Sequence, residues 1–104
     1  MQRRNSQMEE TLRTAFENRW AIGHDDWDPP KIADDAVTST TLTVAGARPG
    51  DPAVASHDQI GAVDVLISAH VQAANTVRVV ILNKTGGQLD IAAGVVFAAV
   101  RIRY

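Results

Sequence analysis

The spacing of apolar residues divides the chain into a helical part followed by a part built of strands. Apolar residues recur every three or four positions from Met8 to Trp20, and this spacing predicts one apolar stripe along an amphipathic helix. Ser6 and Glu9 match a capping box that would begin this helix, and Gly23 would end it. Because a helix of about four turns is marginal alone in water, we expect it to dock on another surface.

After residue 35 the pattern changes to short runs of β-branched and apolar residues separated by turn residues. The runs predicted as strands are Thr38–Val44, Ala53–Ser56, Ala62–Val71, Thr76–Asn83 and Val95–Tyr104, with a short edge segment at Gln88–Ile91. No helical pattern lies between them. We therefore expect an all-β fold over residues 36–104, a small antiparallel β-sandwich or barrel of jelly-roll-like form.

The stretch between these two parts, His24–Asp35, has paired prolines, five aspartates and no periodicity. These features predict an extended arm, so that residues 1–35 form a helix plus arm and residues 36–104 form the domain. The charge distribution follows the same division, since 13 of the 22 charged side chains lie in the first 35 residues.

Composition removes several classes of function. A net charge of −2 argues against direct nucleic-acid binding, which needs clustered lysine and arginine to neutralise phosphates. The lack of cysteine excludes disulfides and thiolate metal sites. No apolar run reaches the roughly 18 residues of a membrane helix, and the opening residues do not form a signal peptide, so we expect a protein made in the cytoplasm without a membrane partner.

No motif in the chain predicts catalytic residues, a metal or a cofactor. His24 precedes a run of aspartates, but neighbouring carboxylates on an extended chain point in different directions. His57 lies between Ser56 and Asp58, and consecutive strand residues face opposite sides, so these three cannot form a catalytic triad. His70 is expected at an interface or partly buried. We therefore do not expect an enzyme.

The predicted strands suggest a homo-oligomer. Their apolar residues stand at consecutive positions, so both faces of a strand need cover, and the small side chains of the domain make a lone core marginal. Closed symmetric association is the usual remedy. The residues expected at the oligomer interface are Val79, Ile81, Val96, Ala98 and Val100.

Three aromatic residues near the start of the chain, Phe16, Trp20 and Trp27, allow two interpretations. They could fold back to cover the sandwich of their own chain. Alternatively, they could anchor the arm on a partner or a neighbouring copy, because tryptophans flanked by polar residues are typical of interface hot spots. We favour the second interpretation, since an arm with its own aromatic residues gains most by reaching outward.

Three stretches of the chain carry a resemblance to a known family: Ile32–Asp51 (IADDAVTSTTLTVAGARPGD), Ser68–Gly94 (SAHVQAANTVRVVILNKTGGQLDIAAG) and Val95–Tyr104 (VVFAAVRIRY). Together they resemble a small β-rich virion protein of tailed bacteriophages, often encoded near the major capsid protein. The similar stretches cover roughly the last two-thirds of the chain. Pro52 departs from the pattern, because a strand residue is more usual there, and it indicates an edge strand or a delayed strand start.

The resemblance implies a capsid decoration or cement protein, or a head fibre, with no catalytic residues. We expect a homotrimer on the virion surface whose arms grip the major capsid protein or a neighbouring subunit. The arm residues expected to make these contacts are Leu12, Phe16, Trp20, Trp27, Pro29 and Pro30. The alternative is a receptor- or carbohydrate-binding module at a fibre tip, using the loops Pro49–Pro52 and Lys84–Gly87, although these loops lack the aromatics that stack on sugars.

Overall fold

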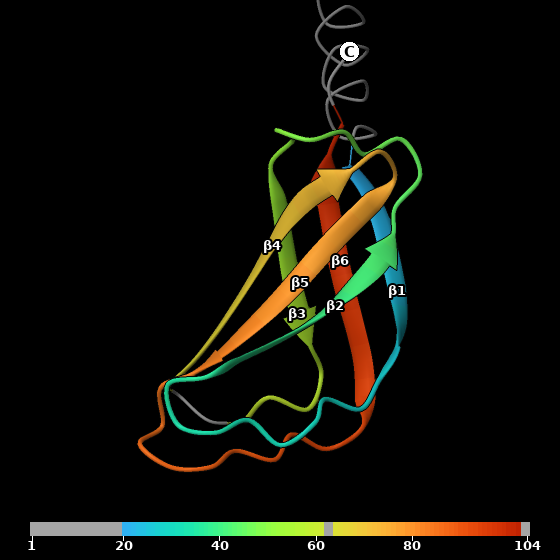
Figure 1. Ribbon diagram of the computed structural model, residues 1–104. Helices are drawn as coiled ribbons and strands as arrows, with labels where there is room; N and C mark the ends of the chain where they lie inside the picture. Colours follow the sequence, from blue (N-terminus) through green and yellow to red (C-terminus); the bar gives the residue numbers. More distant parts are fainter. Residues whose placement is uncertain (1–19, 62–63, 103–104) are drawn as a thin grey trace, which may run out of the picture.

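The computed structural model describes residues 20–61 and 64–102, which form β-strands in two layers (Figure 1). The strands are β1 (Trp20–Trp27), β2 (Val37–Thr43), β3 (Ala53–His57), β4 (Val65–Ala73), β5 (Thr76–Asn83) and β6 (Gly94–Arg101). One antiparallel sheet has the order β1-β6-β3 and the other has the order β2-β5-β4. The expected all-β, sandwich-like architecture is confirmed.

The connections gather at two ends of the sandwich (Figure 1). Only β4 and β5 form a hairpin among the described strands, through a turn in which Asn75 takes a positive φ of 62°. The Trp20 end holds the start of β1, the loop 44–52, this turn and the end of β6. The Trp27 end holds the end of β1, the loops 28–36 and 84–93, and residues 58–61 after β3.

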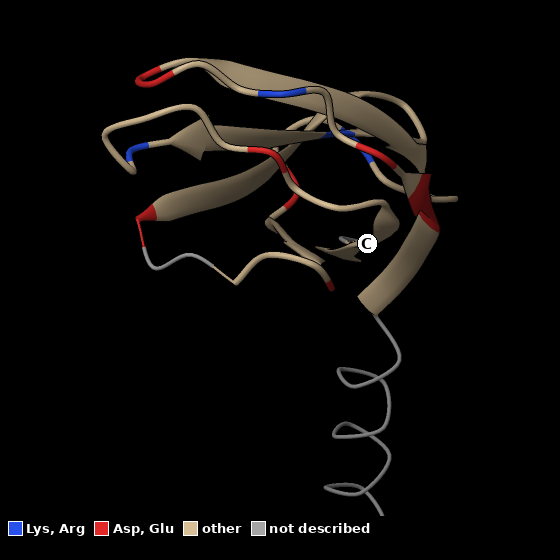
Figure 2. Cartoon of the chain, turned by 90° about the horizontal axis from the view of Figure 1, so that it is seen from below, with Lys and Arg blue, Asp and Glu red and all other residues tan. Residues whose placement is uncertain are grey.

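Charge is distributed unequally between these two ends. Figure 2, which views the molecule from the Trp27 end, shows the acidic residues on the loops and on β1. Eight of the nine aspartates in the described part of the chain lie at or near this end, and they are Asp25, Asp26, Asp28, Asp34, Asp35, Asp58, Asp64 and Asp90. The described arginines, by contrast, lie at or toward the Trp20 end. The sandwich therefore has an acidic end and a weakly basic one.

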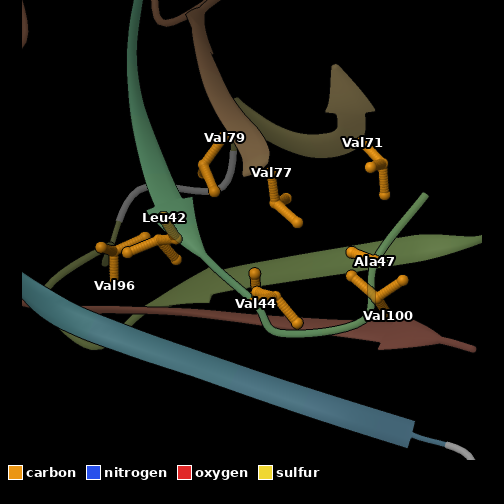
Figure 3. Close-up of a cluster of buried hydrophobic side chains, with 9 residues drawn as sticks. Leu42, Val44, Ala47, Val71, Val77, Val79, Val96 and Val100 are labelled. Atoms are coloured by element: carbon orange, nitrogen blue, oxygen red, sulfur yellow. The ribbon is translucent and has the colours of Figure 1, made fainter. Parts of the chain in front are cut away.

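The core is formed where the inward faces of the two sheets meet (Figure 3). Every second side chain of β5 is fully buried, because successive strand residues point to opposite sides of a sheet. Figure 3 shows Val77 and Val79 from one sheet beside Val96 and Val100 from the other. A second cluster, made by Ile32, Ile81 and Ile91, continues the core toward the Trp27 end.

This core corrects the predicted oligomer interface. The residues assigned to that interface are at most 1% exposed within the single chain, and they are Val79, Ile81, Val96, Ala98 and Val100. On each strand these residues stand at alternate positions, so their side chains point to the same side of the sheet. That side is the inward face, where the opposite sheet of the same chain covers them. A second copy cannot contact them without opening the sandwich.

The second correction concerns the predicted helix end and arm. Residues Trp20–Trp27 form a strand that pairs with β6 along its whole length. Gly23, predicted to end the helix, is buried in the middle of this strand, where an added Cβ would lie 2.6 Å from the Thr43 carbonyl oxygen. Farther along, Ile32 is buried and pairs with Leu89 through two backbone hydrogen bonds. Residues 20–35 therefore belong to the sandwich; the rest of the predicted helix, residues 6–19, lies outside the described residues.

Most of the predicted strands agree with the structure to within a few residues. Thr76–Asn83 has the predicted bounds, whereas the strand predicted at Ala62–Val71 is described from Val65 and ends at Ala73. The expected edge segment at Gln88–Ile91 is reduced to the bridge with Ile32. Pro52 directly precedes β3, which is an edge strand of its sheet, as its position had indicated.

Candidate protein-interaction surface

The outer face of the β1-β6-β3 sheet exposes a group of apolar side chains. The pairing of the strands places Ile22, Ala99 and Val54 side by side in one row across the sheet. The next row brings together His24, Phe97 and Ser56. We call the apolar members of this outer face, Trp20, Ile22, Val54, Phe97 and Ala99, the β6 face; exposed polar residues border them, with Arg101 beside Trp20 and His24 and Ser56 beside Phe97. Such a contiguous apolar group on a small protein is typical of a protein contact.

The large side chains of the β6 face are open to solvent. Ile22 is 69% exposed, Val54 59%, Trp20 43% and Phe97 39%. Nothing in the described part of the chain packs over them. Since burial of apolar surface contributes about 25 cal/mol per Å², covering this face would stabilise any complex that forms there.

A shallow hollow of about 300 Å³ lies within the β6 face. Its lining comes from all three strands and consists of Ile22, Val54, Ala55, Ser56, Phe97, Ala98 and Ala99. Ser56 is the only polar residue among them. At one side the ring of His24 lies 6.1 Å from that of Phe97, centroid to centroid. The small side chain of Ala99, in the row next to that of Phe97, leaves room for an apolar side chain from outside, whereas Ala55 and Ala98 point toward the core.

The three histidines occupy separate places. His57 is buried: its Nδ1 accepts a hydrogen bond from the Gln59 backbone N–H (3.2 Å), which leaves Nε2 to donate to the Trp27 carbonyl oxygen (3.1 Å). It therefore ties β3 to the end of β1. His24 and His70 are exposed on the outer faces of different sheets. Within residues 20–61 and 64–102, no group of three potential metal ligands occurs.

The predicted arm residues have different positions in the structure. Leu12 and Phe16 lie outside the described residues. Trp20 and Pro30 are exposed. Trp27 and Pro29 correct the prediction: Trp27 packs against both core clusters with its ring edge-on to His57 at 6.0 Å, and Pro29 is fully buried. For Trp27, the interpretation that the aromatic residues cover their own sandwich is the right one.

The two loops of the alternative fibre-tip interpretation lie at opposite ends of the sandwich. Pro49–Pro52 belongs to the Trp20 end and Lys84–Gly87 to the Trp27 end. In the second loop, Lys84 donates a hydrogen bond of 2.6 Å to Asp35. This bond and the charge of Asp35 raise the pKa of Lys84, although the pair is exposed and contributes little to stability. The structure therefore does not bring these loops into one binding site.

Sequence reasoning missed Ile22, Val54 and Phe97 as members of an exposed surface. A signal was present in the alternation of Trp20, Ile22 and His24, which puts these residues on one side of an extended strand. The helical spacing through the same tryptophan obscured it. Phe97 stands between the buried residues Val96 and Ala98, and neighbouring strand residues point to opposite sides of a sheet. Once Val96 and Ala98 are known to face the core, the side chain of Phe97 must point outward.

We compared the chain with protein-family models, with characterised proteins and with solved structures, and none of the three comparisons gave a match. In the described part of the chain, no helix has the length and apolar character needed to cross a membrane.

Proposed function

We propose that this chain is a structural protein of a tailed-phage virion, a decoration or cement protein that binds the head shell. The supporting observation is the β6 face. Its exposed apolar side chains begin with Trp20, the first residue of β1. Residues 1–19, which contain most of the predicted apolar stripe, directly precede Trp20 in the sequence. A surface with aromatic residues at its centre and edge is typical of protein contacts that supply much of their binding energy through a few side chains.

The strand order gives this proposal further support. Sheets of order β1-β6-β3 and β2-β5-β4 are what a jelly roll reduced to six strands would have, so we propose that the sandwich is jelly-roll-like. Jelly rolls occur in viral capsid domains and in lectins. The resemblance of the last two-thirds of the sequence to tailed-phage proteins favours the capsid role.

In the proposed mechanism, the arm of residues 1–19 holds the protein on the major capsid protein through the apolar side chains of its predicted stripe, among them Leu12 and Phe16. The protein would act as a homo-oligomer, and we retain the trimer as its proposed form. Several arms on one oligomer convert modest contacts into high avidity, because each further contact forms at a high effective concentration. No enzyme activity, cofactor, nucleic acid or membrane takes part, and copies made in the host cytoplasm would end on the virion surface.

Co-sedimentation with expanded phage shells tests this function. The double variant Leu12→Gln, Phe16→Gln removes the apolar stripe while keeping good helix formers, and its shell binding should fall by roughly tenfold or more as each weakened arm lowers the avidity. The matched control Thr11→Gln, Thr14→Gln changes positions outside the stripe and should bind like the original chain. Both variants keep β1, which a deletion through residue 30 would remove.

Equal shell binding by the two variants would contradict the proposed function. Loss of adsorption to host cells with unchanged shell binding would favour the receptor-binding alternative instead.

A further inference from the structure

We infer that the β6 face packs on the β6 face of a second copy, with the strands of the two sheets running in opposite directions about a twofold axis. The inference goes beyond the proposed function, because it concerns the free protein and uses neither a shell nor residues 1–19. It rests on the charges at the two ends of the outer face and on the hollow between them.

The outer face of the β1-β6-β3 sheet has opposite charges at its two ends. The row at one end pairs Trp20 with Arg101. In the row at the other end, Asp26 pairs with Val95, and Asp58 lies on the other side of Val95 and accepts a hydrogen bond from its backbone N–H (2.9 Å). Arg101, Asp26 and Asp58 are exposed. The two rows between these ends contain the rest of the β6 face, so apolar side chains separate a cation from two carboxylates.

This order of charges makes the face complementary to itself. When the second copy is reversed, the first row of each copy lies over the last row of the other. Arg101 then faces the second copy's Val95, between the carboxylates of Asp26 and Asp58, and the same contact forms again at the opposite end. With the strands in the same direction, carboxylates would face carboxylates. Complementary charges therefore favour the reversed arrangement and fix its register.

The hollow lies where a side chain of the reversed copy would enter it. Phe97 and Ala99 are successive outward residues of β6, and a twofold axis between their rows places the Phe97 ring of each copy over Ala99 of the other. Ala99 lines the hollow together with Ile22 and Val54, which stand on either side of it. Each ring would thus fill the hollow of the opposite copy, and both copies would cover their exposed apolar side chains.

The dimensions of the face predict a reversible contact. Its four rows span about 20 Å and its three strands about 14 Å, whereas stable interfaces commonly bury about 800 Å² on each partner. We therefore expect a dissociation constant in the micromolar range or weaker, so that the pair separates where a tighter contact is offered. A twofold contact doubles whatever form the chain otherwise takes, so a monomer becomes a dimer and the proposed trimer becomes an assembly of six.

The other outer face lacks this self-complementary order and serves as a control. On the β2-β5-β4 sheet, Leu82 lies between Val37 and Leu66 in an apolar row at one end. Two rows farther along, Arg78 lies beside His70, and none of the outward residues of these three strands is acidic. A reversed copy would place apolar side chains over this polar part, with no carboxylate of these strands to meet Arg78.

Reversing the end charges in the full chain tests the inference. Arg101→Glu would bring like charges together at both ends of the pair, and the dissociation constant from sedimentation equilibrium should rise roughly tenfold or more. Asp26→Arg should weaken the pair in the same way. The double variant Arg101→Glu, Asp26→Arg brings opposite charges together again and should recover most of the lost affinity. Lys31→Glu, on an exposed loop outside this face, is the matched control for net charge and should pair like the original chain.

Cysteine cross-linking reports the direction of packing, since the sequence contains no cysteine. In the reversed arrangement, Val54 of one copy lies over Ser56 of the other, because these are successive outward residues of β3. Val54→Cys and Ser56→Cys, mixed and mildly oxidised, should give a linked pair with one copy of each variant, identified by peptide mass. Ser68→Cys, exposed on the other sheet, replaces Ser56→Cys as the matched control and should give little product.

Sedimentation of apolar variants provides a further measurement. Ile22→Thr, Val54→Thr keeps strand-forming residues but removes apolar surface from the β6 face, and at concentrations where the original chain pairs its mass should be half as large. Val37→Thr, Leu66→Thr removes comparable residues from the other sheet and should leave the mass unchanged.

Three outcomes would overturn the inference. The first is unchanged pairing by Arg101→Glu, or no recovery in the double charge variant. The second is equal linking of Val54→Cys to Ser56→Cys and to Ser68→Cys, or no link to either. The third is the same mass for both apolar variants. Because these measurements use no shells, they can fail while Leu12→Gln, Phe16→Gln still loses shell binding, and the proposed function can fail while they succeed.

Discussion

Asn83 shows how one buried polar residue organises the Trp27 end. Its side chain is fully buried, yet both ends of the amide are hydrogen-bonded. The nitrogen donates to the carbonyl oxygens of Ile32 (2.9 Å) and Gly87 (2.7 Å), and the oxygen accepts from the Thr85 backbone N–H (2.9 Å). Residues from two loops that are distant in sequence are thus held by one side chain. Local sequence patterns predict the turn after Asn83, but they do not reveal this long-range role.

Replacing this side chain should destabilise the fold strongly. In Asn83→Ala the carbonyl groups of Ile32 and Gly87 lose a buried partner, and we expect the free energy of unfolding to fall by about 3 kcal/mol, since each unsatisfied buried group costs about 1–3 kcal/mol. Urea unfolding measures the change. Gln88→Ala, an exposed neighbour, should stay within about 0.5 kcal/mol of the original chain. A similar small change in Asn83→Ala would show that water replaces the lost bonds.

At the scale of single elements, the sequence correctly predicts strands in which buried and exposed residues alternate strictly, but it does not predict β1. In β5 the alternation of buried and less buried residues matches the predicted strand from end to end. In β1 the residues before Trp20 follow helical spacing, and aspartates replace apolar residues near the end of the strand. The pairing of β1 with β6 joins residues more than 60 positions apart, so no local pattern displays it.

Gly23 provides a direct test of the β1 assignment. A Cβ at this position would lie 2.6 Å from the Thr43 carbonyl oxygen and 2.9 Å from Cγ2 of Val44, so β1 could keep its place only if the backbone moved. We expect Gly23→Ala to lower the free energy of unfolding by about 2 kcal/mol, the usual cost of overpacking. Gly87→Ala, where a Cβ meets nothing within 4 Å, is the control and should change stability little. Thermal or urea unfolding of both variants gives the comparison.

At the scale of the whole molecule, the pattern of apolar residues correctly indicates surfaces that need cover but does not say what covers them. In β5 and β6, every second side chain is buried. This alternation alone would fit burial against a second sheet of the same chain and burial against a second copy of the protein equally well. Only the arrangement of all strands shows that the chain covers Val79 and Val100 itself. The same arrangement shows that Ile22 and Phe97 have no cover in the described part of the chain. The candidate surface is thus a property of the assembled sandwich.

Two deletions distinguish the sandwich from the segment that precedes it. Removing residues 1–19 leaves every described strand, so cooperative thermal unfolding should persist. Removing residues 1–27 also takes away β1, leaves one side of β6 without its hydrogen-bonding partner and uncovers the core beside Val44, so cooperative unfolding should be lost. Circular dichroism during heating reports both outcomes. Identical melting curves for the two deletions would argue against β1 as part of the fold.

The concentration of aspartates at the Trp27 end has a consequence for a particle that carries many copies. If every copy stood on its Trp20 end, the outermost layer of the particle would consist mainly of carboxylates. Two such particles would repel each other over the Debye length, which is about 30 Å at 0.01 M ionic strength and about 8 Å at 0.15 M. The coat would then act as a colloidal stabiliser, keeping crowded particles apart in dilute media and allowing closer approach as salt rises.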